Sequence, residues 1–311
     1  MTSILTNNAA MTALQTLRTI DSSMEDTQAR VSSGLRVGTA SDNAAYWSIA
    51  TTMRSDNMAL SAVQDALGLG GAKVDTSYAA MESAIEVVKE IKAKVVAATE
   101  EGVDKSKIQE EIDQLKEQLR SISESASFSG ENWIAGDAAT KTVVSGFVRD
   151  SSGAVTVKTT EYVLSDAADG NLLFGGDGAG NIEYTTGILG TVSAFTGVGD
   201  VSVDTLDLNA FDPADMAANM QESLDLIESA LQSMTSAAAE LGSISMRIEL
   251  QEDFVSTLTD SIDSGIGRLV DADMNEESTR LKALQTQQQL AIQSLSIANT
   301  ASESILTLFR Q

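Results

Sequence analysis

The sequence contains no cysteine and no histidine in its 311 residues. These absences exclude thiol and imidazole nucleophiles, Ser-His-Asp triads and the usual zinc sites. No disulfide framework can form, so cysteine usage gives no information about the compartment. Proline occurs once and aromatic residues number thirteen, and the remaining composition is rich in Ala, Ser, Thr, Leu and Met. This balance favours long helices over a compact mixed fold.

Positive charge is also scarce, because 20 Lys and Arg stand against 45 Asp and Glu, for a formal net charge of −25. We therefore expect no nucleic acid and no anionic membrane surface as a partner, since both are polyanions. The longest charge-free run, Ala283 to Ser302, is too rich in Gln, Ser and Thr to span a bilayer. Residues 1 to 8 have no basic leader and no long apolar core, so no Sec-type signal peptide is predicted.

Motifs with recognisable chemistry are missing as well. The acidic run from Asp271 to Glu277 resembles the start of an EF-hand loop, but Glu276 replaces the required Gly and Lys282 the required Glu. The glycine-rich run at 175–180 is a single imperfect copy of a calcium β-roll repeat. No phosphate-binding or dinucleotide-binding glycine loop is present. We predict no catalytic residues, no metal site and no cofactor, and hence a protein that is not an enzyme.

The charge-free run near the C-terminus has the clearest pattern. Its small and apolar residues recur at steps of three and four, the spacing of a helix that packs lengthwise on another helix. Further apolar side chains, including Leu290, Ile292 and Ile297, lie off this stripe, so several neighbours are needed to cover the helix. The run therefore predicts self-assembly. The stripe comprises Leu281, Leu284, Gln288, Ala291, Leu295, Ala298, Ser302, Ile305 and Phe309.

The N-terminal end mirrors this pattern over residues 3 to 35. Thirteen of the first 35 residues are Ser, Thr or Asn, which are weak helix formers, so we expect this helix to be disordered alone and to order when packed. Its heptad positions are Met11, Leu14, Leu17, Met24, Val31 and Leu35. From the two ends together we predict a polymerisation seam. Its residues are Leu14, Leu17, Met24, Val31, Leu281, Leu284, Leu295, Ala298, Ile305 and Phe309.

Two longer helical regions lie inside these ends. In the first, Asp42 is the expected N-cap of a helix to about Leu67, and glycines at 68, 70 and 71 are expected to interrupt the pattern. Two further helices are expected. One carries Met81 to Val95 and ends at about Thr99, the other covers residues 108 to 122, and together they should form an antiparallel hairpin. The second region keeps heptad spacing over residues 216 to 262, with an end expected at Gly265 and Gly267. Asp271 or Asp273 is expected to cap the last helix.

Residues 128 to 213 differ from the rest, because they hold 13 of the 22 glycines, eight of the thirteen aromatic residues and the single proline. Four segments have the β-branched or alternating character of short strands. These are Val143 to Val148, Val155 to Leu164, Ile182 to Thr185 and Val201 to Leu208. We predict a small β-rich module at the surface.

The predicted fold class is mainly α with a β-rich insert. Both chain ends form long antiparallel helical coiled-coil rods, with a small surface β module in the middle. We predict three domains. Residues 1–38 and 272–311 form a terminal coiled-coil polymerisation domain, residues 39–130 and 214–271 a helical rod domain, and residues 131–213 a surface-exposed variable insert.

Both ends also resemble a known family. The run Arg30-Val-Ser-Ser-Gly-Leu-Arg36, followed by Thr39-Ala-Ser-Asp42-Asn-Ala-Ala45, is similar to the N-terminal signature of bacterial flagellins, in the variant of rhizobial and related alphaproteobacterial members. The resemblance covers roughly residues 1 to 130 and 214 to 311, and the insert carries no family signal. The similar C-terminal elements are Leu241-Gly242, Arg247-Ile-Glu249, Arg268-Leu-Val-Asp271-Ala-Asp273, Ile297-Ala-Asn299 and Leu306-Thr-Leu308.

The resemblance implies a structural subunit that self-polymerises into the bacterial flagellar filament, a helical propeller for motility. It implies secretion to the cell exterior through the type III flagellar export apparatus, without a cleaved signal peptide. The implied partners are many identical or paralogous flagellin subunits, an export chaperone, the filament cap and the hook-junction proteins.

Two alternatives are weighed against this reading. A hook-filament junction (hook-associated) protein shares the chain ends with flagellins, and differs in forming a single ring rather than thousands of copies along a filament. A helical signalling rod of the chemoreceptor type would also be rich in Ala, Ser and Gln, but it needs a membrane span or a partner domain. The sequence shows no pattern for either.

Overall fold

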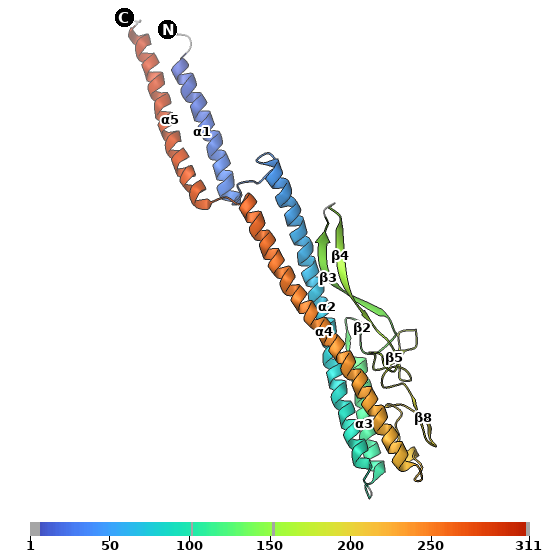
Figure 1. The fold of residues 1–311 in the computed structure, drawn as a ribbon. Helices are drawn as coiled ribbons and strands as arrows, with labels where there is room; N and C mark the ends of the chain where they lie inside the picture. Colours follow the sequence, from blue (N-terminus) through green and yellow to red (C-terminus); the bar gives the residue numbers. More distant parts are fainter. Residues whose placement is uncertain (1–6, 101, 151–152, 309–311) are drawn as a thin grey trace. The chain divides into compact units, whose positions relative to one another are not determined.

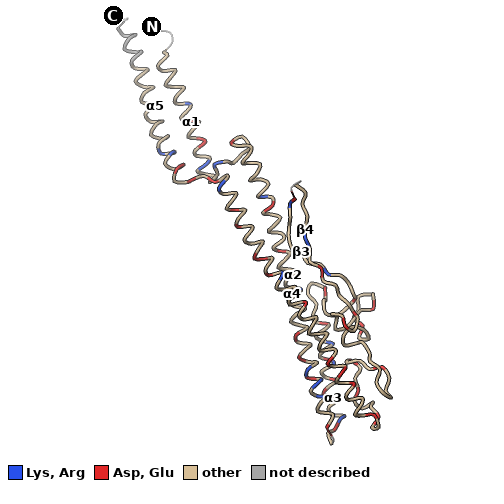
Figure 2. The backbone as a smooth tube through the Cα atoms, viewed as in Figure 1, with Lys and Arg blue, Asp and Glu red and all other residues tan. Residues whose placement is uncertain are grey.

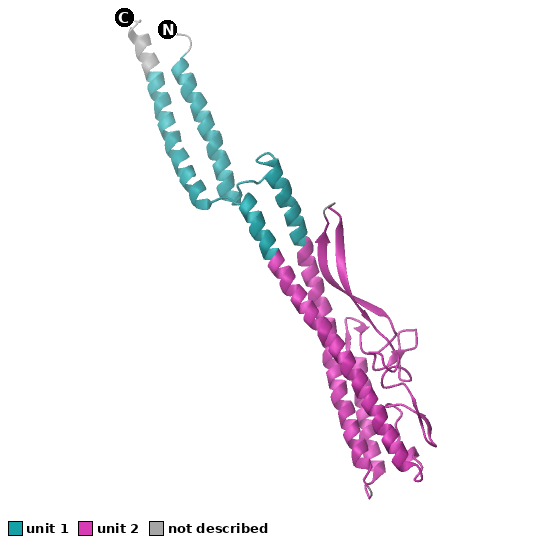
Figure 3. Cartoon of the chain, viewed as in Figure 1, with its two compact units in different colours: residues 1–58, 259–311 teal, residues 59–258 magenta. Residues whose placement is uncertain are grey.

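The computed structural model describes residues 7–100, 102–150 and 153–308, and describes side chains up to residue 300. Within these ranges the chain is mainly helical, with small β-hairpins in its middle region, so the predicted fold class is confirmed (Figure 1). The helices are α1 (Asn8–Ser33), α2 (Ala44–Ala98), α3 (Lys105–Ser125), α4 (Met216–Val270) and α5 (Met274–Leu308). The chain divides into two compact units, residues 1–58 with 259–311 (unit 1) and residues 59–258 (unit 2) (Figure 3).

Helix α2 is a single helix of 55 residues, so the predicted interruption at its glycines is wrong. An interior glycine costs only about 1 kcal/mol relative to alanine, and packing can outweigh that cost. Two of these glycines permit close packing. A Cβ atom at Gly70 would collide with Val143 of the insert, and one at Gly71 would touch Ile248 of α4.

Helix α4 also has 55 residues and continues to Val270, beyond its predicted end at Gly265. Its glycines again lie where another side chain approaches. Within unit 1 the space beside Gly265 is filled by Met53, and within unit 2 Gly242 lies against the ring of Tyr78. Glycine therefore marks close helix contacts here, and it does not end the helix.

The helix starts differ in part from the predicted caps. Asn43, not Asp42, caps α2, because its Oδ1 atom accepts a hydrogen bond from the Tyr46 amide at 3.1 Å. Asp42 instead closes the preceding loop by accepting from the amides of Gly38 and Thr39 at 3.0 and 2.9 Å. These bonds, the one from Thr39 foremost, lower the pKa of Asp42. Asp273 caps α5, as predicted, by accepting from the Asn275 amide at 2.9 Å.

In unit 2, helices α2 and α4 pack antiparallel, which two contacts illustrate. Lys92 Nζ lies 2.5 Å from Glu228 Oε2, and Ser245 Oγ donates to Asp75 Oδ1 at 2.7 Å. The buried side of α2 follows the heptad spacing of the sequence, and α3 and the insert enclose it further. Its buried residues include Leu60, Val63, Leu67, Val74, Met81, Val88, Ile91 and Val95.

The described part of residues 127–213 forms four antiparallel two-stranded sheets, a short 3-10 helix η1 (Leu208–Ala210) and loops. Its longest hairpin, β3–β4, matches the predicted strands at 143–148 and 155–164. Several of its large side chains, including those of Trp133 and Phe174, are fully buried. The strands are β1 (Ser127–Phe128), β2 (Glu131–Asn132), β3 (Thr140–Arg149), β4 (Val155–Val163), β5 (Gly175–Gly176), β6 (Ile182–Glu183), β7 (Ser193–Phe195) and β8 (Gly199–Val201).

The predicted strand over residues 201–208 is wrong, because β8 ends at Val201 and the segment instead docks on α3. Arg120 binds both carboxylate oxygens of the buried Asp204, at 2.9 and 2.6 Å. The Leu206 carbonyl accepts from Gln109 Nε2 at 3.1 Å and from Lys116 Nζ at 2.8 Å. The bonds to the Leu206 carbonyl take up a backbone group that a strand would have paired in a ladder.

Candidate assembly surface

Helices α1 and α5 of unit 1 pack antiparallel along their length. Three polar contacts fix their register. Asn7 Nδ2 donates to the Ala298 carbonyl at 3.0 Å, Gln288 Nε2 donates to Asp21 Oδ1 at 2.7 Å, and Arg30 lies 3.3 Å from Glu277. We call this helix pair the terminal pair.

The stripe of α5 that is half-buried in the terminal pair has the spacing that the sequence predicts. It consists of Leu281, Leu284, Gln288, Ala291, Leu295 and Ala298. On α1 the half-buried or buried stripe is Ala10, Ala13, Leu17, Ile20, Met24, Thr27 and Val31. The structure therefore brings most residues of the predicted seam together within one chain.

One residue of the predicted seam differs from this arrangement, and two others have side chains outside the described set. Leu14 is exposed and lies off the α1 stripe, where the smaller Ala13 takes the inward position. Periodicity alone does not separate these two, because a large apolar residue on an outer face resembles a core residue. Ile305 belongs to α5, but its side chain is outside the described set, and Phe309 lies outside the described residues.

Large apolar side chains remain uncovered on the outside of the terminal pair. Leu290, Ile292 and Ile297 are 59%, 52% and 69% exposed, and Met11 on α1 is 63% exposed. Full burial of such a side chain is worth about 1.5 to 3 kcal/mol. Between Ala13 and Ile20 of α1 and Leu290 of α5 lies a groove of about 450 Å³. Figure 2 shows a stretch of α5 without charged residues, and in the sequence residues 283–302 contain no Lys, Arg, Asp or Glu.

The base of the terminal pair is tied together by backbone and side-chain contacts within unit 1. Leu35 and Asp271 form an antiparallel β-bridge, and the Arg36 and Val37 amides both donate to the Val270 carbonyl, at 2.7 and 3.2 Å. The Ala272 amide donates to the Gly34 carbonyl at 2.9 Å. We call these contacts the strap. A small cluster of Val37, Ala50, Ile266 and Val270 is buried beside it.

Glu277 is a buried charged residue of unit 1, with 5% of its surface exposed. Its Oε1 atom lies 3.3 Å from Arg30 and 3.8 Å from Arg280, while its Oε2 atom has no hydrogen-bond partner. Its place in the first turn of α5 suits a negative charge, because the amide end of a helix carries a partial positive charge. The sequence suggested only an acidic, capping role for this region.

No site with catalytic geometry stands out in the described part of the chain. Its residues contain no group of three or more His, Cys, Asp or Glu able to hold a metal ion. A search of the same residues also finds no helix long and apolar enough to cross a bilayer.

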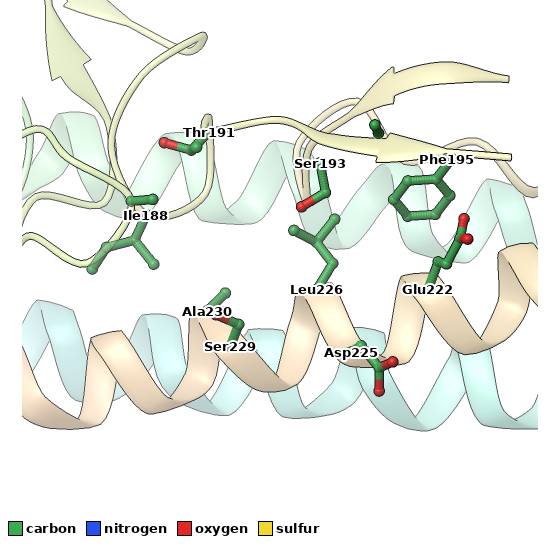
Figure 4. A pocket seen from close by; sticks show the side chains of 11 residues that line it. Ile188, Thr191, Ser193, Phe195, Glu222, Asp225, Leu226, Ser229 and Ala230 are labelled. Atoms are coloured by element: carbon green, nitrogen blue, oxygen red, sulfur yellow. The ribbon is translucent and has the colours of Figure 1, made fainter.

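Figure 4 shows a pocket of about 320 Å³ between α4 and the insert, with Ile188, Phe195 and Leu226 in its wall. Its nearest carboxylates already have partners. Glu222 accepts from the Thr196 amide at 3.1 Å and from its hydroxyl at 3.0 Å. Asp225 accepts from Gln221 at 3.0 Å. The pocket is therefore a packing gap where the insert rests on α4.

Comparison with known proteins relates both chain ends to one family. Residues 4–139 match the family model described as the bacterial flagellin N-terminal helical region, and residues 224–309 match the bacterial flagellin C-terminal helical region. Flagellin D of Rhizobium meliloti is 57% identical, and the flagellin of Brucella melitensis biotype 1 is 43% identical, with all of each chain covered.

A solved structure described as a putative flagellar hook-associated protein from Vibrio parahaemolyticus has a similar fold, with a TM-score of 0.53. The match covers 74% of this chain and all of that one, at 16% sequence identity. At that identity the likeness describes the fold alone.

Proposed function

Since this chain belongs to the bacterial flagellins, the non-enzymatic subunits that polymerise into the extracellular flagellar filament, we propose that its terminal pair drives that polymerisation. The proposed polymerisation domain comprises residues 1–38 and 272–311. The helical rod of residues 39–130 and 214–271 would support it, and the insert of residues 131–213 would face the solvent.

The observation that carries this proposal is the uncovered apolar side of the terminal pair. Leu290, Ile292 and Ile297 are exposed in the single chain and lie in a run of twenty residues without charge. Copies that each carry a net charge of −25 repel one another, so the least costly contact between them is a surface free of charge. Packing of several copies around α5 would remove these side chains from water.

The proposed seam has two sides with different roles. Its inward residues, such as Leu17 and Leu284, hold α1 against α5 within one subunit, so that both helices enter the filament as one body. The outward residues, with Leu14 among them, contact the neighbouring copies. Small residues such as Ala291 and Ala298 allow helices to approach closely. Slightly different packings of this surface would produce a supercoil that converts rotation into thrust.

The apolar side of α5 also supports the proposed partners outside the filament. Before assembly this surface requires protection from water and from premature contact with other copies. An export chaperone that holds the C-terminal stretch would supply that protection, and export would proceed through the type III flagellar apparatus with the chain unfolded. A filament cap and hook-junction proteins complete the proposed set of partners.

The hook-junction alternative has less support than the filament subunit. Relatives that carry the name flagellin are 43% and 57% identical over whole chains. The likeness to a hook-associated protein concerns only the fold.

The test is Leu295→Asp, compared with the same new charge at the exposed Ala179 of the insert. Leu295→Asp buries an unpaired carboxylate in the terminal pair, and we expect it to abolish polymerisation. Electron microscopy after salting-out would show filaments for Ala179→Asp only, and circular dichroism would show that unit 2 remains folded in both. Filaments of normal length from Leu295→Asp would refute the proposed seam.

A further inference from the structure

The groove on the terminal pair hollows one flank of that pair. Most of the side chains in its wall are small, none carries a charge, and its volume is about 450 Å³. A cavity of about 150 Å³ already admits a molecule the size of benzene, so this groove has room for branched aliphatic side chains of another body. Its wall includes Ala13, Thr16, Ile20, Leu290, Ala291 and Ser294.

The opposite flank of the terminal pair carries large apolar side chains. Successive residues of a helix are rotated by about 100°, so the two neighbours of an inward-facing residue point to opposite flanks. On α5 the inward residue is Ala291, and Leu290 before it lines the groove, which leaves Ile292 after it on the other flank. On α1 Thr16 likewise precedes an inward residue and lines the groove, whereas Leu14 follows one. Leu14 therefore lies on the same flank as Ile292.

Leu14 and Ile292 also lie at the same level along the terminal pair. Hydrogen bonds set position 7 opposite position 298 and position 21 opposite position 288. Position 14, midway between these contacts on α1, is therefore opposite position 293. Leu14 and Ile292 are 39% and 52% exposed, and we call these two side chains the ridge. The same register sets Thr16 close to Ala291, so the ridge and the groove occupy one level on opposite flanks.

The ridge belongs to the charge-free part of the terminal pair. Residues 8–17 of α1 and 283–302 of α5 contain no Lys, Arg, Asp or Glu, although the whole chain has a net charge of −25. A neighbour that fills the groove must also be free of charge at the contact, because an unpaired charge is costly to bury. The ridge of a second copy meets this requirement, and it is part of the same surface that is proposed to assemble.

We propose that the ridge of one copy inserts into the groove of the next copy in the filament. The ridge and the groove are different patches on opposite flanks, so their contact is head-to-tail and repeats from copy to copy, as an open helical array requires. Two ridges that met each other would instead close into a pair. The inference rests on the proposed polymerisation through the terminal pair, and it names the side chains that meet within it.

The absence of cysteine makes a direct test possible. Ile292→Cys places a single thiol on the ridge, and Ser294→Cys places one in the wall of the groove. The two variants are polymerised separately and as an equal mixture under reducing conditions, and the filaments are then oxidised with diamide. A disulfide requires Cβ atoms about 4 Å apart, so only direct neighbours react. In the matched control Gln293→Cys, at an exposed position that points away from α1, replaces Ile292→Cys.

Disulfide-linked dimers are expected in the mixed filaments of Ile292→Cys and Ser294→Cys. Filaments of either variant alone and the dispersed mixture should give only background. Three results would overturn the proposal: no dimers in the mixed filaments, as many dimers with Gln293→Cys as with Ile292→Cys, and dimers in filaments of one variant alone. Each of these results is obtained on filaments, so the proposed polymerisation would stand while this contact fails.

Filling the groove gives an independent measurement that needs no thiol. Ser294→Phe should raise the protein concentration needed for assembly by about tenfold, the factor that corresponds to losing the burial of one ridge side chain. Gln293→Phe adds the same ring outside the groove and should leave that concentration nearly unchanged. Adding Ile292→Ala to Ser294→Phe should restore assembly, because the shortened ridge makes room for the ring. No rise with Ser294→Phe, or no recovery in the double variant, would also overturn the proposal.

Discussion

The terminal pair and the helices of unit 2 share one heptad spacing but differ in how much they bury. In unit 2 the inward residues Val74, Met81 and Ile91 are fully buried. In the terminal pair the inward residues are mostly half-buried, and the fully covered ones are the polar Thr27 and Glu277. A two-helix contact covers one stripe of each helix, whereas α3 and the insert cover further sides of α2 and α4.

This difference means that the same sequence pattern performs two tasks. In unit 2 it builds a core that one chain completes by itself, which supports independent stability. In the terminal pair it builds a half-covered surface, whose burial requires other copies. The core of unit 2 and the assembly surface of the terminal pair are therefore separated along the chain, and a change inside that core should leave the surface of the terminal pair intact.

The strongest test of this separation removes the terminal pair. A chain trimmed to about residues 40 to 270 should form no filaments, because the outward apolar surface is gone, yet it should retain the thermal unfolding transition of unit 2. Electron microscopy and calorimetry of trimmed and full chains measure the two properties. Filaments from the trimmed chain would contradict the separation, and so would loss of the unfolding transition.

A matched pair of core truncations should give the next largest difference. Ile91→Ala opens a cavity in unit 2 and should lower the free energy of unfolding by about 2 to 5 kcal/mol. Leu284→Ala removes a half-buried side chain and should cost about 1 kcal/mol in the dispersed protein. Denaturant titration in a Trp47→Phe background, where the buried Trp133 is the single tryptophan, reports on unit 2 by fluorescence. An equal loss from both variants there would refute the contrast.

Each unit also has a buried carboxylate paired with an arginine, and the two pairs should differ in strength. Arg120→Ala removes two hydrogen bonds from Asp204 and should lower the free energy of unfolding by about 1 to 3 kcal/mol. Because Arg120 is partly exposed, we expect a value in the lower part of that range. Arg30→Ala should cost less than about 1 kcal/mol, because Arg280 remains beside Glu277. Urea titrations of the two variants would compare them directly, and a larger loss for Arg30→Ala would reverse the ranking.

The smallest expected effect is a loss of unit 2 stability in acid. Glu131 accepts hydrogen bonds from Trp133 Nε1 at 3.2 Å and from Lys73 Nζ at 3.1 Å, and both bonds lower the pKa of Glu131 from its usual 4.5. Its stabilising contribution is thus present above the unfolded-state pKa and disappears as the pH falls through the lower folded-state value. The urea midpoint of Trp133 fluorescence should fall between about pH 6 and about pH 3. Glu131→Gln should flatten that dependence, and an unchanged slope would exclude the contribution.

The sequence predicted the helical ends and the insert well, because their signals are local. Heptad spacing on α5 gave the inward positions from Leu281 to Ala298 correctly, and the composition of residues 128–213 located the non-helical block. The family was also predictable from the two end signatures, and the comparisons confirm it.

Tertiary contacts explain where the sequence predictions failed. Gly70 looked like a helix breaker, but its role is to admit Val143, which lies 73 positions away in the chain. The run over 201–208 looked like a strand, but Arg120, Gln109 and Lys116 bind it to α3. The exposure of Met246, Leu250 and Phe254 on α4 was hidden in the same way, because only the packed structure tells which of two apolar rows on one helix stays uncovered.

The strap at the base of the terminal pair has a mechanical consequence. Two backbone segments form the strap: residues 34–37, which follow α1, and residues 270–272, which lead into α5. They lie side by side and are hydrogen-bonded to each other. A pull applied to the terminal pair is then divided between two covalent backbone segments, which the cross-links hold side by side. A rotating propeller applies such a pull with every turn, and the strap would keep that tension shared by both segments in each subunit.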